Sequence, residues 1–258
     1  MFDPSEDDGA TGPRVSQIFL ALLAIFALAG VMLAIGQGGR FGVFAFVTVG
    51  WVISLCLHEF GHAATAYVGG DRSVSEQGYL TLNPLRYTNP VLSILLPLAF
   101  LAMGGIGFPG GAVYVNTAAI RTPAWRAATS AAGPATNLVC LIAIALTLSA
   151  PSLAPNFAAA LAFLGLLQAT ALVLNLLPIP GLDGFGVIAP FLSPELRAGA
   201  MRAGRLIGML LLVAIIALPQ VLTPIWRASA GLCMALGVTR DDIIAGYSLF
   251  RFWDYSGL

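Results

Sequence analysis

Long apolar runs separated by short polar stretches make up most of this chain. A helix needs about 20 apolar residues to cross the roughly 30 Å hydrocarbon core of a bilayer. Runs that reach or approach this length occur at Ile18–Gly36, Gly42–Val68, Val91–Phe108, Ala127–Ala150, Phe157–Leu177 and Leu206–Leu222. The pattern therefore predicts an all-α polytopic membrane protein with about five to six transmembrane helices.

The polar stretches between these runs are too short to hold a separate domain of 50 or more residues. Residues 1–17 are rich in acidic side chains, unlike the basic start of a secretory signal, and we expect a disordered tail there. Residues 18–222 are expected to form the membrane-embedded domain, with its core at 42–192. Two shorter apolar stretches within 223–258 predict a C-terminal tail at the membrane interface.

Composition narrows the class of protein further. Hydrophobic residues make up 58% of the 258 positions and charged residues only 9%, against roughly 25% charged in a soluble domain. The formal net charge is zero, so no basic field for nucleic acid is expected. The three cysteines, Cys56, Cys140 and Cys233, form no C-x-x-C pair, which argues against a thiolate metal site.

Candidate chemistry is concentrated in one apolar run, where the chain reads His-Glu-Phe-Gly-His. His58 and His62 are the two histidines of the chain, and residues four apart lie on one face of a helix. This H-E-x-x-H spacing lets both imidazoles bind one Zn²⁺, with Glu59 beside them as the acid/base group. Ionisable residues inside an apolar span are costly and usually functional.

A zinc site with two histidines needs a third protein ligand and an open position for water. Asp183 directly follows the apolar run Phe157–Leu177, in a stretch where prolines and glycines end the helix and turn the chain. It is therefore the expected third ligand. Asn137 lies about one turn inside another apolar run, where an amide needs a hydrogen-bond partner.

Three motifs together resemble the site-2 protease family of intramembrane zinc metalloproteases (peptidase M50). They are the His58–His62 motif, Gly133-Pro-x-x-Asn137 and the segment from Asn175 to Gly184 that contains Asp183, and they occur in the family's order. The resemblance implies that His58, His62 and Asp183 bind zinc and that Glu59 is the catalytic residue. It further implies that Asn137 helps to position substrate and that the substrate is a single-span membrane protein.

The chain departs from the family pattern in the third motif, where Gly181 stands in place of a usual proline and Phe185 in place of a usual glycine. Neither change removes a ligand, although the turn is expected to be looser. The chain resembles the compact bacterial members of the family. We expect it to carry no PDZ or CBS domain, because its polar stretches are too short to hold one.

Zinc geometry also constrains the predicted topology. The histidines and Asp183 can meet only if an even number of crossings separates them, so Val91–Phe108 is expected to be re-entrant. Two alternating stretches, Gly78–Leu82 and Ala112–Asn116, predict a small β element near the zinc site. Eight of the twelve arginines fall on the side expected to be cytoplasmic, which favours a multi-pass protein of the bacterial cell membrane with its zinc nearer the cytoplasmic face.

Rival functions would use the same residues. A metal-free transporter or proton relay would use the His/Glu cluster without Asp183 nearby, and an inactive family member would only bind transmembrane partners. A membrane zinc protease that trims peptides released into the cytosol would differ in its substrates alone. The main hypothesis is hydrolysis of peptide bonds in or near the transmembrane segment of a membrane-anchored protein.

Overall fold

The described part of the computed structural model covers residues 15–86, 113–217 and 219–253 and contains helices but no strands. Four of its helices are long and apolar enough to cross a membrane: α1 (Gln17–Ala34), α2 (Gly39–Gly69), α5 (Pro123–Leu148) and α6 (Pro155–Asn175). The protein is therefore built as a membrane protein. The predicted number of five to six spans is higher than the four found among the described residues.

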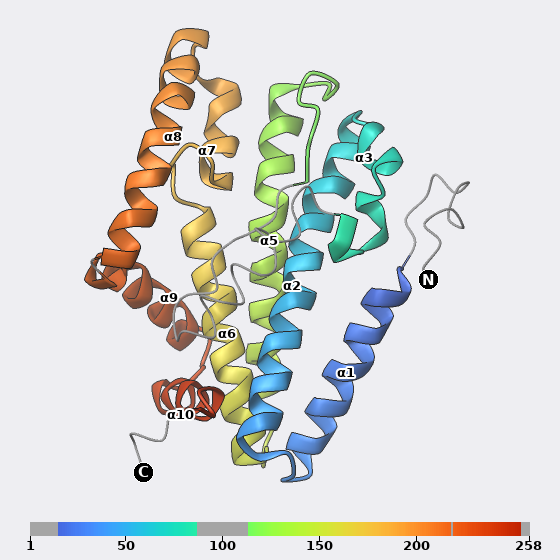
Figure 1. Ribbon diagram of the computed structural model, residues 1–258, viewed down its shortest axis with the longest axis vertical. Helices are drawn as coiled ribbons and strands as arrows, with labels where there is room; N and C mark the ends of the chain where they lie inside the picture. Colours follow the sequence, from blue (N-terminus) through green and yellow to red (C-terminus); the bar gives the residue numbers. More distant parts are fainter. Residues whose placement is uncertain (1–14, 87–112, 218, 254–258) are drawn as a thin grey trace.

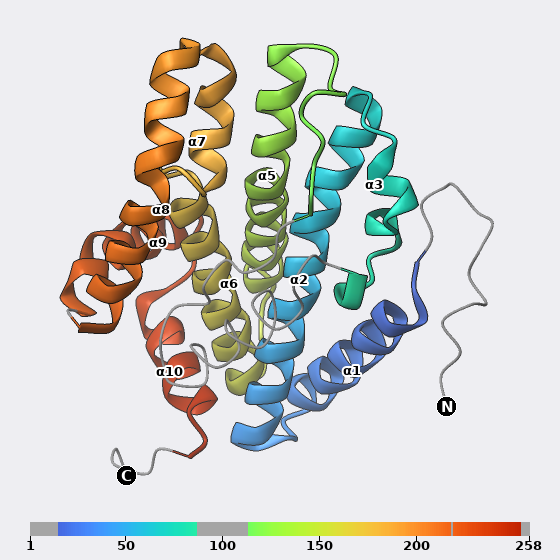
Figure 2. The same ribbon diagram turned by 45° about the horizontal axis from the view of Figure 1, so that its top comes forward.

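Helix α6 lies at the centre of the bundle, packed against α2 and α5, and α1 lies along α2 (Figure 1). In its most apolar stretch 83% of the residues are buried, against 17% in α1. Helix α6 is apolar on all sides, which is typical of a helix surrounded by other helices. The C-terminal end of α2 and the start of α5 lie at the same end of the bundle (Figure 2). Helix α6 runs toward this end but stops short of it, and the turn that follows α6 leads into α7.

Local sequence signals fix where these helices begin and end. Ser16 caps the start of α1, where its hydroxyl accepts the N–H of Phe19, and Thr122 caps the start of α5, where its hydroxyl accepts the N–H of Trp125. Proline occupies the first turn of both α5 and α6, where its missing N–H costs nothing.

The C-terminal part of the described chain is helical. The predicted span Leu206–Leu222 is divided between α8 (Pro194–Ala217) and η5 (Pro219–Leu222), because proline cannot continue a helix. The two stretches expected at the membrane interface form α9 (Thr223–Ala235) and α10 (Arg240–Phe250), and both contact α6.

The predicted β element is wrong where the structure describes it. The stretch Gly78–Leu82 contains the 3₁₀ helix η1 (Tyr79–Thr81), and residues 113–116 have no regular secondary structure. The N–H groups of Val113 and Asn116 donate to side chains of Glu59 and Asp71 rather than to a strand. The alternation of apolar and polar residues did not reveal that carboxylate side chains would accept these backbone N–H groups.

Short helices complete the described structure: α3 (Ser73–Glu76), η2 (Pro84–Arg86), α7 (Asp183–Ile188) and η4 (Ala189–Phe191). The predicted re-entrant segment, Val91–Phe108, lies outside the described residues.

Candidate metal centre

Helix α2 presents His58 and His62 on one face, one turn apart, as their spacing predicts. Both side chains are buried, and their Nε2 atoms lie 3.0 Å apart. Two ring nitrogens at that distance point toward a common region rather than away from each other.

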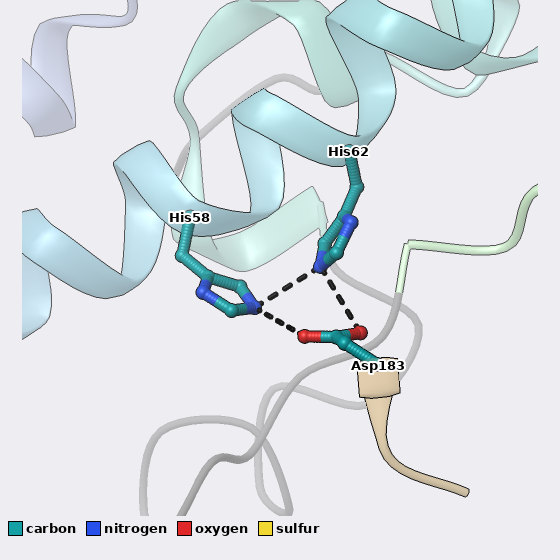
Figure 3. Close-up of side chains that lie close together, drawn as sticks. All are labelled: His58, His62 and Asp183. Carbon is teal, nitrogen blue, oxygen red and sulfur yellow. Dashed lines mark hydrogen bonds and ion pairs between the residues drawn. The ribbon is translucent and has the colours of Figure 1, made fainter. Parts of the chain in front are cut away.

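Asp183 reaches the same region from the start of α7 (Figure 3). Its Oδ1 lies 3.3 Å from Nε2 of His62 and its Oδ2 lies 3.3 Å from Nε2 of His58. One nitrogen or oxygen from each of the three residues can be chosen so that all lie within 4.8 Å of one another. The structure thus brings Asp183 to a pair of histidines that lie more than 120 positions before it in the sequence.

A turn between α6 and α7 aims Asp183 at the histidines. Gly181 within this turn has φ +103°, a value that proline, with φ near −65°, cannot adopt. The turn therefore differs in its backbone from one built on the proline that the family pattern has here. Burial would raise the pKa of Asp183, but hydrogen bonding to His58 and His62 outweighs it and holds the pKa of this carboxyl below its ordinary value.

The second ring nitrogen of each histidine faces an acceptor. Nδ1 of His58 lies 2.6 Å from Oδ1 of Asn137, and Nδ1 of His62 lies 2.7 Å from the carbonyl oxygen of Thr129. A histidine that donates Nδ1–H keeps the lone pair of Nε2 free for a metal ion, and this arrangement is usual for metal-binding histidines. Both acceptors belong to α5.

Helix α5 passes unusually close to the two histidines at Gly133. A Cβ atom added to Gly133 would lie 2.3 Å from Nε2 of His62 and 2.5 Å from Nε2 of His58. Any larger residue would fill the space in front of both nitrogens. Two imidazole nitrogens and one carboxylate, facing a space that only glycine leaves open, fit the ligand set of a zinc ion.

Glu59 lines the same cavity, which has a volume of about 260 Å³ and also contains His58, His62 and Asp183. Its side chain is buried, and its Oε2 accepts the N–H of Val113 at 3.1 Å. A carboxylate can accept about four hydrogen bonds, so this one contact leaves capacity for a water molecule.

Asn137 also lines the cavity and is buried. Its side chain bonds to His58 through Oδ1 and to Gln168 through Nδ2. Contact between Asn137 and a substrate stays a prediction, whereas its contact with the His58 ring is part of the described structure.

Sequence reasoning missed two residues that shape the site, Thr129 and Gln168. Thr129 contributes only its backbone carbonyl, which no residue type reveals. Gln168 could have been noticed as an amide within an apolar span, because such an amide must find a partner there.

Comparison with known proteins supports the same class. The chain is 45% identical over 93% of its length to the protein named "Putative zinc metalloprotease Rip2" of Mycolicibacterium smegmatis, of which the match covers 95%. It is 44% identical over 96% of its length to the protein of the same name in Mycobacterium tuberculosis, covering 98% of that protein. It is 31% identical over 61% of its length to "Putative zinc metalloprotease YwhC" of Bacillus subtilis, covering 74% of it. No protein-family model and no solved structure matches the chain.

The fold and the site define a membrane protein with a candidate metal centre among its apolar helices. With these relatives, the chain belongs to the site-2 protease family of zinc metalloproteases.

Replacing Asp183 with alanine is expected to remove metal binding while the bundle stays folded. The two histidines alone would leave the ion without its carboxylate ligand, so we expect a loss of zinc affinity larger than the roughly 10–100-fold typical of outer-shell changes. The measurement is zinc bound per purified chain, together with affinity by chelator competition.

The matched control is Glu195→Ala, which removes an exposed carboxylate from the first turn of α8. Zinc content in this variant should equal that of the wild type. Full zinc affinity in Asp183→Ala would show that Asp183 is not a ligand.

Proposed function

We propose that this protein is an intramembrane zinc endopeptidase that hydrolyses peptide bonds in or near the transmembrane segment of membrane-anchored proteins. The observation that carries the proposal is the group formed by His58, His62 and Asp183, which the candidate membrane helix α2 and the turn after α6 bring together. A hydrolytic metal site at this position suits a substrate that is itself embedded in the bilayer.

The residues divide into those that bind the metal and one that moves protons. His58, His62 and Asp183 would hold Zn²⁺, and when bound the ion would supply Lewis-acid polarisation of water and of a carbonyl oxygen. Glu59 would take a proton from the attacking water and give it to the leaving amine, as a general base and then a general acid. Its place in the same buried cavity supports this role.

The arginines support an orientation with the metal site nearer the cytoplasmic face of a bacterial cell membrane. Short loops on the cytoplasmic side of membrane proteins carry an excess of arginine. At the C-terminal end of α2, Arg72 lies over the ring of Tyr67 and Arg121 donates to the carbonyl oxygen of Gly69. Arg126 lines the cavity. Arg40, at the start of α2, lies at the other end and bonds to the backbone of Ser248.

The experiment compares proteolysis of a single-span membrane protein with that of a soluble peptide taken from the polar flank of its transmembrane segment, by purified enzyme in liposomes. We expect one zinc per chain and cleavage of the membrane-embedded substrate at sites within or next to its transmembrane segment, mapped by mass spectrometry. Chelation should abolish cleavage, and added Zn²⁺ should restore it, because the ligands are side chains that persist without the ion.

Two results would contradict the proposal. Cleavage of the soluble peptide alone would indicate a protease that trims released peptides. A purified chain that binds no zinc would instead favour a metal-free relay through the His/Glu cluster.

A further inference from the structure

Four buried polar side chains form one continuous hydrogen-bonded chain behind the candidate metal centre. Nδ1 of His58 lies 2.6 Å from Oδ1 of Asn137, and Nδ2 of Asn137 donates to Oε1 of Gln168 at 2.9 Å. Nε2 of Gln168 donates to Oγ of Ser54 at 2.8 Å, and the Ser54 hydroxyl donates to the carbonyl oxygen of Trp51 at 2.8 Å. This series of hydrogen bonds therefore starts on α2 at His58, passes through one residue of α5 and one of α6, and returns to α2 one turn before His58.

The direction of these hydrogen bonds is set by the end farthest from the metal centre. The carbonyl oxygen of Trp51 can only accept, so the Ser54 hydroxyl donates to it and offers its oxygen to Gln168. The amide NH₂ of Gln168 must then face Ser54, which leaves the carbonyl oxygen of Gln168 for Asn137.

Pairing each donor with an acceptor also fixes the direction of the two remaining hydrogen bonds, from Asn137 to Gln168 and from His58 to Asn137. The NH₂ group of Asn137 faces Gln168, so its Oδ1 faces the imidazole of His58. An acceptor at that position requires a proton on Nδ1 of His58 and therefore leaves the Nε2 lone pair free, on the side of Asp183.

We propose that Gln168 and Ser54 are positioning residues that set the tautomer and ring orientation of His58 through Asn137. This inference rests on the proposed metal site and extends it by two residues that are not among its three candidate ligands. Gln168 is 1% exposed, so water does not replace its hydrogen bonds. An unsatisfied amide at this depth would cost several times the net gain of one ordinary hydrogen bond.

A second buried polar residue of α6 bonds only within its own helix. Thr170, two residues along α6, is also fully buried, but its hydroxyl bonds to the carbonyl oxygen of Leu166 in its own helix. Gln168 instead bonds to residues of two other helices, and the series of hydrogen bonds that passes through it ends at His58, a candidate metal ligand. The difference between these two residues supplies a matched control.

The experiment compares wild type with Gln168→Met, Gln168→Glu and Thr170→Val. Methionine has nearly the same length and no acceptor. Glutamate, protonated or ionised, still offers an oxygen to the NH₂ group of Asn137, so it keeps the direction of the remaining chain. The measurements are zinc affinity by chelator competition and the ¹⁵N spectrum of histidine-labelled protein, with and without zinc.

The spectrum is readable because the chain has only two histidines. His62 serves as an internal reference, since its Nδ1 faces the backbone carbonyl of Thr129 and not the polar chain. An unchanged His62 signal in a variant shows that the site around it is still folded.

We expect Gln168→Met to lower zinc affinity about 10–100-fold, the usual effect of an outer-shell change. The Nδ1–H signal of His58 should be lost or exchange faster with water in this variant, and the His62 signal should persist. Gln168→Glu and Thr170→Val should match the wild type in both measurements.

The proposal is overturned if Gln168→Met keeps wild-type zinc affinity and an unchanged His58 signal. It is equally overturned if Gln168→Glu loses zinc as Gln168→Met does, because packing rather than an acceptor would then explain both. If the wild type binds no zinc, the proposed function fails, while the His58 signal in metal-free protein still decides this inference.

Discussion

Glu59→Gln is expected to keep one zinc per chain and to lower the rate of peptide-bond cleavage by about 10²–10⁴-fold, the range typical of a lost general acid–base group. Glutamine has the same shape as glutamate and can still accept the N–H of Val113 through its carbonyl oxygen. It cannot take a proton from water at neutral pH. The measurement is the initial rate of cleavage of a single-span substrate, with zinc content determined on the same preparation.

The matched control for this variant is Glu76→Gln, which neutralises an exposed glutamate at the end of α3. This control should cleave at the wild-type rate. If Glu59→Gln cut a transmembrane substrate as fast as the control, another group would have to carry the proton. If it lost zinc, Glu59 would have to be reassigned from proton transfer to metal binding.

The parts of the site that follow from local spacing could be predicted from the sequence. His58 and His62 lie on one helical face because four residues make about one turn, and this holds whatever the rest of the chain does. Asp183 could be placed near them because a zinc site with two histidines needs a third protein ligand, and this carboxylate directly follows an apolar run. The four candidate spans likewise follow from hydropathy.

The parts that depend on partners could not be predicted in the same way. Gly78–Leu82 alternates like a strand, but it forms a 3₁₀ helix with Leu82 at φ +58°, because no neighbouring strand pairs with it in the described residues. The acceptors for the two histidines come from α5, and one of them is a backbone carbonyl. Such contacts depend on the rotation and depth of neighbouring helices, which periodicity does not specify.

Gln168 shows why a polar residue in an apolar span has to be read together with its neighbours. Its hydrogen bonds join α6 to α5 and α2, and neither partner is near it in sequence. The sequence indicates that such an amide must find hydrogen-bond partners. Only the packed bundle shows that the resulting series of hydrogen bonds ends on His58. A buried polar network of this kind specifies one arrangement of the helices because each donor and acceptor group described in it faces one suitable partner.

Gly133→Ala is expected to abolish zinc binding and proteolysis, although in an open helix the same change is stabilising by about 1 kcal/mol. The added methyl group would lie 2.3 Å from Nε2 of His62 and 2.5 Å from Nε2 of His58, far inside contact distance. The rings cannot turn away without breaking their bonds to Asn137 and Thr129. Helix α5 must therefore move away from α2, and overpacking of this kind costs about 1–3 kcal/mol in stability.

The control is Gly231→Ala in α9, where an added Cβ meets no atom within 4 Å. The measurements are zinc affinity, the thermal midpoint and cleavage rate for both variants. Gly231→Ala should match the wild type in zinc affinity and cleavage, whereas Gly133→Ala should bind no zinc even if its thermal midpoint falls only slightly. Wild-type zinc affinity in Gly133→Ala would mean that the ion does not lie in the space in front of both Nε2 atoms, because that is where the methyl group would stand.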